Sequence, residues 1–141
     1  MYTFDENIVS DLYKESRGHR PYETFWTVWN LSSDAEKQEI WDDLLQEADY
    51  EAEMESQRKA RAVEQFAKMI QNTIALGASN EEAAIDWLLE AEGFTLYDYQ
   101  YGADYIAYHF DLPYENEWRK DLEYIAQEKV CELYETELAF R

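Results

Sequence analysis

Disulfide bonds are the first feature that this sequence lacks, because Cys131 is its one cysteine. A chain that uses no disulfide framework is typical of a reducing compartment, so we expect a cytoplasmic protein. Cys131 lies between Val130 and Glu132, on the apolar stripe of a predicted helix. We therefore expect it to be a small buried hydrophobic residue rather than a nucleophile.

Long apolar runs and basic residues are also scarce. No stretch approaches the roughly 18 apolar residues of a membrane span, and the N-terminus has neither the basic region nor the apolar core of a signal peptide. The chain has 32 acidic and 12 basic residues, a net charge of −20. Such a chain is repelled by phosphate and by anionic lipid, so we expect it to bind neither nucleic acid nor membrane directly.

Motifs for catalysis or metal binding are missing as well. His19 and His109 are the two histidines, and neither has a second histidine or a cysteine at metal-ligand spacing. There is no glycine-rich phosphate loop and no nucleophile elbow. We predict a protein that is not an enzyme and uses no cofactor or metal. A hydrolase or metal-dependent enzyme that uses some of the many carboxylates is the alternative.

With four glycines and two prolines, the sequence favours helices joined by short loops. Aromatic residues make up 16% of the chain, enough for a buried core. We predict an all-α fold, a single helical domain over 1–141 with five or six helices. One of them is a long acidic helix. The predicted helices cover residues 5–16, a short segment from Pro21, 34–76, 79–93, 95–112 and 113–139.

Capping signals support several of these boundaries. Ser33 with Glu36 and Ser79 with Glu82 have the spacing of capping boxes, and Thr95 with Asp98 repeats it. Gly77 is a natural end for the long helix. A helix over 34–76 would be about 65 Å long. We expect a bend at 49–55, and an intact helix in a dimer or hairpin is the alternative.

The strongest pattern is an acidic row in the long helix. Between Asp34 and Glu55 the chain has ten acidic residues and one basic residue, Lys37. Five of the acidic residues recur at i, i+4 spacing, which predicts one ridge with steps of about 6 Å along the axis. Like charges at this spacing destabilise a helix by roughly 0.2–0.5 kcal/mol per pair. Folding alone does not require this cost, so the pattern favours a binding role. The alternative is a solvated outer face. The predicted ridge is Glu39, Asp43, Glu47, Glu51 and Glu55, and Asp42 and Asp49 lie beside it.

Tyrosines alternate with acidic residues in the second half of the chain. Tyr97 and Tyr99 stand at a predicted helix start after a turn, so we expect them to contact a partner. Tyr101, Tyr105 and Tyr108 have helical spacing, and we expect at least one of them in the core.

The whole-chain composition resembles the small acidic DNA-mimic proteins with which phages and mobile elements block restriction enzymes, CRISPR effectors or other DNA-binding host proteins. The stretch 11–21 (DLYKESRGHRP), followed by Trp26 and Trp29, also resembles uncharacterised proteins of tailed phages. The first resemblance implies an inhibitor of the antirestriction or anti-CRISPR type. It would bind the basic surface of a host DNA- or RNA-binding protein, such as a nuclease complex, in the host cytoplasm. The alternative is a phage structural or regulatory protein that forms a homodimer through aromatic helical surfaces. DNA mimics share no fold, so the resemblance assigns no residues.

Overall fold

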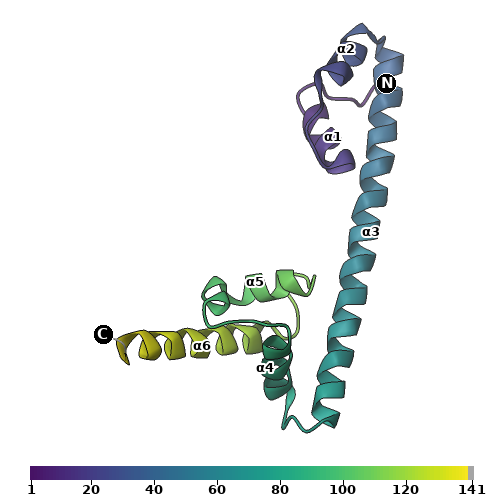
Figure 1. The fold of residues 1–141 in the computed structure, drawn as a ribbon. Helices are drawn as coiled ribbons and strands as arrows, with labels where there is room; N and C mark the ends of the chain where they lie inside the picture. The colour runs from purple at the N-terminus through teal and green to yellow at the C-terminus, as the bar shows by residue number, and fades with distance from the viewer. Residues whose placement is uncertain (140–141) are drawn as a thin grey trace. The chain divides into compact units, whose positions relative to one another are not determined.

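A computed structural model describes residues 1–139, and these residues form helices and no strand (Figure 1). The predicted all-α fold with one long helix is confirmed. In chain order the helices are α1 (Val9–Arg17), α2 (Glu23–Leu31), α3 (Asp34–Ala75), α4 (Glu81–Ala91), the short 3₁₀ helix η1 (Asp98–Tyr101), α5 (Gly102–His109) and α6 (Arg119–Ala139).

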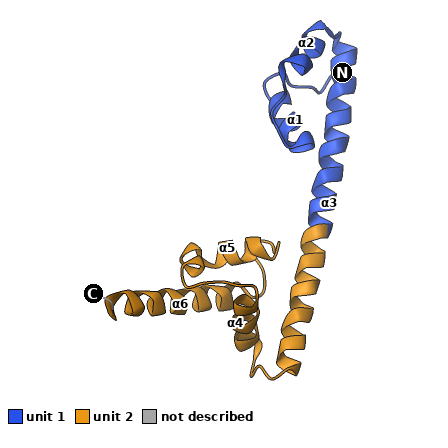
Figure 2. Ribbon diagram, in the orientation of Figure 1, with its two compact units in different colours: residues 1–57 blue, residues 58–141 orange. Residues whose placement is uncertain are grey.

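The chain divides into two compact units, which Figure 2 colours separately. Unit 1 comprises 1–57, with α1, α2 and the N-terminal part of α3, and unit 2 comprises 58–141. Each unit has its own buried cluster of apolar side chains. The single domain over 1–141 stays a prediction.

The N-terminal helices start later than the sequence predicted. A turn over 6–8 precedes α1, and Pro21 lies before α2 rather than at its first position. Tyr22 has extended backbone at the N-cap of α2. The capping box before α3 is confirmed. The Ser33 amide donates to Glu36 Oε1 at 3.1 Å, and the Glu36 amide donates to Ser33 Oγ at 3.3 Å. The hydrogen bond from the Ser33 amide to the carboxylate is the main cause of a lowered pKa of Glu36.

Helix α3 runs uninterrupted from Asp34 to Ala75, so no break marks the predicted bend at 49–55. That segment contains neither glycine nor proline, the residues that most often kink a helix. Gly77 follows the helix with φ of +129°, a conformation that favours glycine. The predicted stop at Gly77 is confirmed.

Three later boundaries differ from the prediction. Asn80, not Ser79, caps α4, because its Oδ1 accepts the Ala83 amide at 2.8 Å. The predicted tyrosine-rich helix is split at Gly102, where η1 gives way to α5. Helix α6 starts at Arg119 rather than near Pro113, after Asn116 Oδ1 accepts the Trp118 amide at 3.0 Å.

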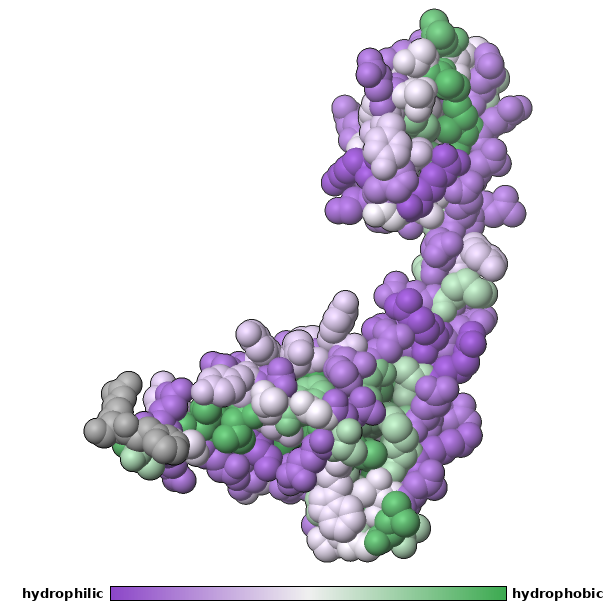
Figure 3. Space-filling model, in the orientation of Figure 1, coloured by the Kyte–Doolittle hydropathy of each residue, from purple (hydrophilic) through white to green (hydrophobic). Residues whose placement is uncertain are grey.

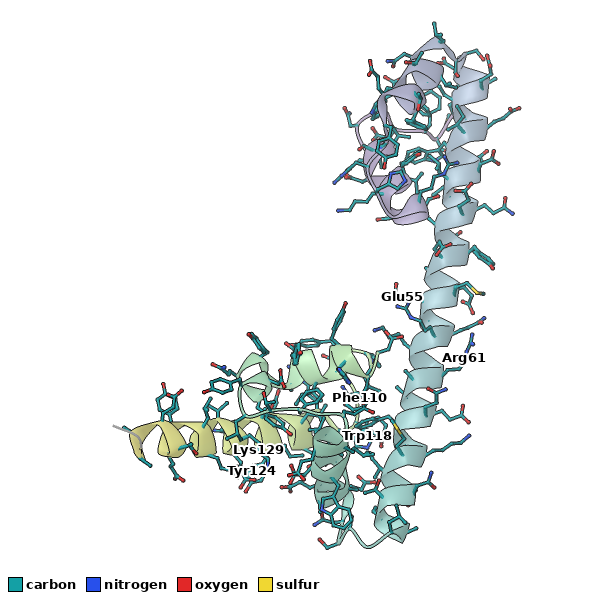
Figure 4. The ribbon with its side chains drawn as sticks, in the orientation of Figure 1. Glu55, Arg61, Phe110, Trp118, Tyr124 and Lys129 are labelled. Atoms are coloured by element: carbon teal, nitrogen blue, oxygen red, sulfur yellow. The ribbon has the colours of Figure 1, made fainter. Side chains whose placement is uncertain are left out.

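The two cores are rich in aromatic side chains. In unit 1, Trp29, Trp41 and Leu44 are buried with Val9, Leu12 and Tyr13. In unit 2, the Phe66 ring lies 4.9 Å from the ring of Phe110 and 4.8 Å from that of Trp118 (both labelled in Figure 4). The prediction that Cys131 is buried is wrong: Cys131 is exposed, on a surface lined by residues of α6 alone. Four other large apolar side chains are exposed as well: Ile8, Tyr22, Leu45 and Leu138.

Candidate partner-binding surface

The predicted ridge does not lie on one face of α3. Successive residues of an α-helix are rotated by 100°, so each i, i+4 step turns the row by about 40°. From Glu39 to Glu55 the row turns through about 160°. Glu39 therefore lies on the outer side of the helix, whereas Glu51 and Glu55 are in line with the buried residue Leu44. The five residues therefore form a row that winds around the axis instead of keeping to one side of the helix.

Glu47, in the middle of the row, is held by unit 1 itself. Its Oε2 accepts from Ser16 Oγ at 2.7 Å and from Arg17 Nε at 3.1 Å. The hydrogen bonds from Arg17 and Ser16 lower the pKa of Glu47, so its charge is retained and compensated within the chain. Through these hydrogen bonds, Glu47 links α3 to α1. Glu47 therefore leaves the set of candidate contact residues.

Three members of the row meet at one shallow concavity. Asp43, Glu47 and Glu51 line it together with Ser16, Gln46 and Tyr50, and its volume is about 430 Å³. Asp43 and Glu51 are exposed. Glu55 is also exposed, and it lies at the far end of the row (Figure 4).

A different set of carboxylates shares one side of α3. Four of its members follow one another in steps of three, seven and four residues, which keeps them close to the side of the helix opposite Trp41 and Leu44, and the fifth, Asp43, lies at the edge of that side. All of them are exposed. We call this set the acidic face: Glu39, Asp42, Asp43, Asp49 and Glu53.

The acidic face extends about 21 Å along the helix axis. Two neutral amides hydrogen-bond to it: Gln38 Nε2 donates to Asp42 at 2.9 Å, and Gln57 Nε2 donates to Glu53 at 3.2 Å. Within residues 1–139, none of the ion pairs involves a residue of the acidic face. Figure 3 shows the hydrophilic character of the α3 surface. The carboxylates are thus displayed without compensation by lysine or arginine.

The sequence prediction named four of these residues and missed Glu53. Glu53 breaks the i, i+4 pattern, but it follows Asp49 by four residues and Asp42 by eleven. A search for acidic residues at a mean period near 3.6, rather than at exact steps of four, would have found it.

The two tyrosines predicted to meet a partner differ from each other. Tyr97 is 59% exposed and keeps this role as a candidate. Tyr99 is 2% exposed and belongs to the core of unit 2, so the prediction for Tyr99 is wrong. Tyr99 lies in η1, whose tight turn directs it inward, against the ring of Phe94 at 5.8 Å. Burial, with the nearby Asp86 and Glu90 carboxylates, raises its pKa to about 12.

Sites for other chemistry are sparse in the described part of the chain. Over residues 1–139, no three His, Cys, Asp or Glu side chains are grouped so that they could hold a metal ion. His109 Nε2 lies 3.2 Å from Glu92 Oε2, and the His19 ring stacks on Tyr22 at 4.7 Å. None of the described helices combines the length and the apolar character that crossing a membrane requires.

Comparisons with known proteins add no relative. No family model, curated protein or solved structure matches the chain.

Proposed function

We propose that this protein binds the basic, nucleic-acid-binding surface of another protein through the acidic face of α3, and thereby acts as a DNA mimic. The observation that carries the proposal is a row of exposed carboxylates along about 21 Å of a helix, which form no ion pair with a lysine or arginine among residues 1–139. Phosphates of one DNA strand advance about 3.4 Å per nucleotide, so this length corresponds to about six nucleotides.

Two physical arguments support this reading over a merely solvated helix. Unit 1 contains 15 acidic and 4 basic residues, so its self-repulsion opposes folding. Arg17, Arg20 and Lys37, three of its four cations, pair with Glu47, Asp11 and Glu6, which leaves the acidic face uncompensated. A basic partner would relieve that repulsion, and its association would be accelerated by long-range attraction.

The test is retention of host proteins on the immobilised chain, followed by displacement with double-stranded DNA. We expect a DNA- or RNA-binding protein to be retained at low salt and to be released both by high salt and by the DNA competitor. The acidic-face variant should lose this retention. It carries three substitutions on the outer side of α3: Asp42→Asn, Asp49→Asn and Glu53→Gln.

A matched control removes the same number of charges from exposed positions of α6. It carries Glu132→Gln, Glu135→Gln and Glu137→Gln. The control should keep the partner, since the acidic face is intact. Equal loss in both variants would mean that net charge alone attracts the partner. If the retained proteins are not displaced by DNA, mimicry is refuted.

A further inference from the structure

Unit 2 carries an unusual run of tyrosines. Residues 94–118 include six tyrosines and five acidic residues, and neither lysine nor arginine. Tyr99 is the one buried tyrosine of the six, and the others are exposed. We call these five the tyrosine face: Tyr97, Tyr101, Tyr105, Tyr108 and Tyr114.

The rings of Tyr101 and Tyr108 do not serve the core. Tyr101 and Tyr108 are 68% and 81% exposed, and Tyr101 touches the neighbouring Tyr105 at a ring distance of 5.2 Å. Pale side chains of intermediate hydropathy stand out near α5 in Figure 3. Large exposed aromatic groups gathered in one region are typical of an interaction surface. Tyrosine suits that role, because it offers a rigid ring with little loss of conformational entropy.

The chain itself shows which group fits beside such a tyrosine. The Arg119 guanidinium lies 3.9 Å from the centre of the Tyr114 ring, and its Nη1 donates to Asp104 Oδ1 at 2.7 Å. The hydrogen bond to Asp104 raises the pKa of Arg119. One guanidinium thus stacks on a ring and hydrogen-bonds to a carboxylate at the same time, which an ammonium group does less well.

A second arginine lies beside the same face. Arg58 and Asp111 line a concavity of about 450 Å³ together with Tyr105 and Tyr108. Arg58 Nε is 2.9 Å from Asp111 Oδ2. Twice, therefore, an arginine of unit 2 is found where a tyrosine and an aspartate of this segment come together.

We infer that the tyrosine face binds arginine side chains of a basic partner protein, with guanidinium groups stacked on Tyr101 and Tyr108. The inference rests on the proposed function, because it assumes a basic partner, and it adds the residue type that the partner presents. The negative charge of this segment decides which molecule the tyrosine face can bind. A second copy of this chain would bring the same acidic segment, and nucleic acid would bring phosphates, so both are repelled.

The experiment compares an oligoarginine and an oligolysine peptide of equal length, titrated into the full chain and followed by calorimetry. The wild-type chain should bind oligoarginine at least about two-fold more tightly than oligolysine, since a guanidinium can stack on a ring and hydrogen-bond to a carboxylate at once, which an ammonium does less well. Tyr101→Ala with Tyr108→Ala should reduce this preference, because it weakens oligoarginine binding more than oligolysine binding.

Three controls make the outcome specific. Tyr134→Ala removes a tyrosine of α6 that is 65% exposed and should change neither affinity. Tyr101→Phe with Tyr108→Phe keeps the rings and should keep the preference for arginine. The acidic-face variant should weaken both peptides equally and leave their ratio unchanged.

Each result separates the two proposals. An unchanged ratio in the Tyr101 and Tyr108 alanine variant would overturn the tyrosine-face inference while the acidic face still stands. Peptide binding that is insensitive to the acidic-face variant would count against the proposed function instead. A homodimer that dissociates in the same alanine variant would assign the tyrosines to self-assembly and would overturn the inference.

Discussion

Two single variants, Glu47→Ala and Glu51→Ala, are compared. The comparison distinguishes a carboxylate that stabilises unit 1 through its contacts from one that contributes only charge. Both residues lie in the same helix, one turn apart. Each has two acidic neighbours at i, i+4 spacing, so each substitution relieves two like-charge pairs. Each also introduces the same helix-favouring residue. The difference between the two variants therefore measures the contacts that Glu47 makes with α1.

The expected size of that difference follows from two contacts. Glu47 and Arg17 are 44% and 45% exposed, so solvent weakens their ion pair, which contributes about 0.2–1 kcal/mol. The hydroxyl of the buried Ser16 would lose its acceptor, which adds about 1 kcal/mol. We expect Glu47→Ala to lower the free energy of unfolding by about 1–2 kcal/mol more than Glu51→Ala does.

The assay is urea unfolding followed by circular dichroism, with native-state hydrogen exchange in α1 to assign the loss to unit 1. In an Arg17→Ala background the effect of Glu47→Ala should shrink by the ion-pair contribution. Because the pKa of Glu47 is lowered by folding, the stability it contributes is fully present above the unfolded pKa of glutamate. That contribution should be lost as the pH falls through the lower folded pKa.

Two results would refute this reasoning. Equal free energies of unfolding for Glu47→Ala and Glu51→Ala would show that the contacts to α1 add nothing. A destabilisation by Glu47→Ala that stays constant down to acidic pH would show that it arises from something other than the charged hydrogen bonds.

Three further predictions concern the cores and one loop. Leu44→Ala should lower the free energy of unfolding by about 2–5 kcal/mol, whereas Leu45→Ala, at an exposed neighbouring position, should change it by under about 1 kcal/mol in urea unfolding. Tyr99→Phe should leave the melting temperature unchanged or raise it, because the Tyr99 hydroxyl is buried and no group of residues 1–139 forms a hydrogen bond with it. The hydrogen bond from Lys59 lowers the pKa of Asp111, so its stabilising effect is present above the unfolded pKa and is lost at lower pH. The melting temperature of Asp111→Asn should therefore fall less than that of the wild type on acidification.

Much of the helical pattern could be predicted from the sequence, because helix signals are local. The Ser33–Glu36 capping box and Gly77 bracket α3 correctly. The missed boundaries also have local causes. Asn80 competes with Ser79 for the cap of α4, and Gly102 adopts φ of +79°, which divides the tyrosine-rich segment. Choosing between adjacent capping residues depends on backbone geometry that the sequence alone does not specify.

The candidate site was predictable in composition but not in geometry. Ten acidic residues between Asp34 and Glu55 are evident in the sequence. The pairing of Glu47 with Arg17 is not, because it joins residues 30 positions apart through the packing of α1 on α3. Tyr99 shows the same limit, since a 3₁₀ turn directs one tyrosine of the segment inward and leaves its neighbours outside.

Carboxylates and tyrosines would make separable contributions to binding, and they belong to different compact units. Attraction to the acidic face is electrostatic, so it falls steeply as salt is added. Stacking of arginine on the tyrosine face depends less on ionic strength, because part of it comes from contact between the ring and the guanidinium plane. Substitutions in one unit should leave the core of the other intact. A partner that binds through both faces would therefore retain some affinity at high salt, and that residual affinity should disappear in the Tyr101 and Tyr108 alanine variant.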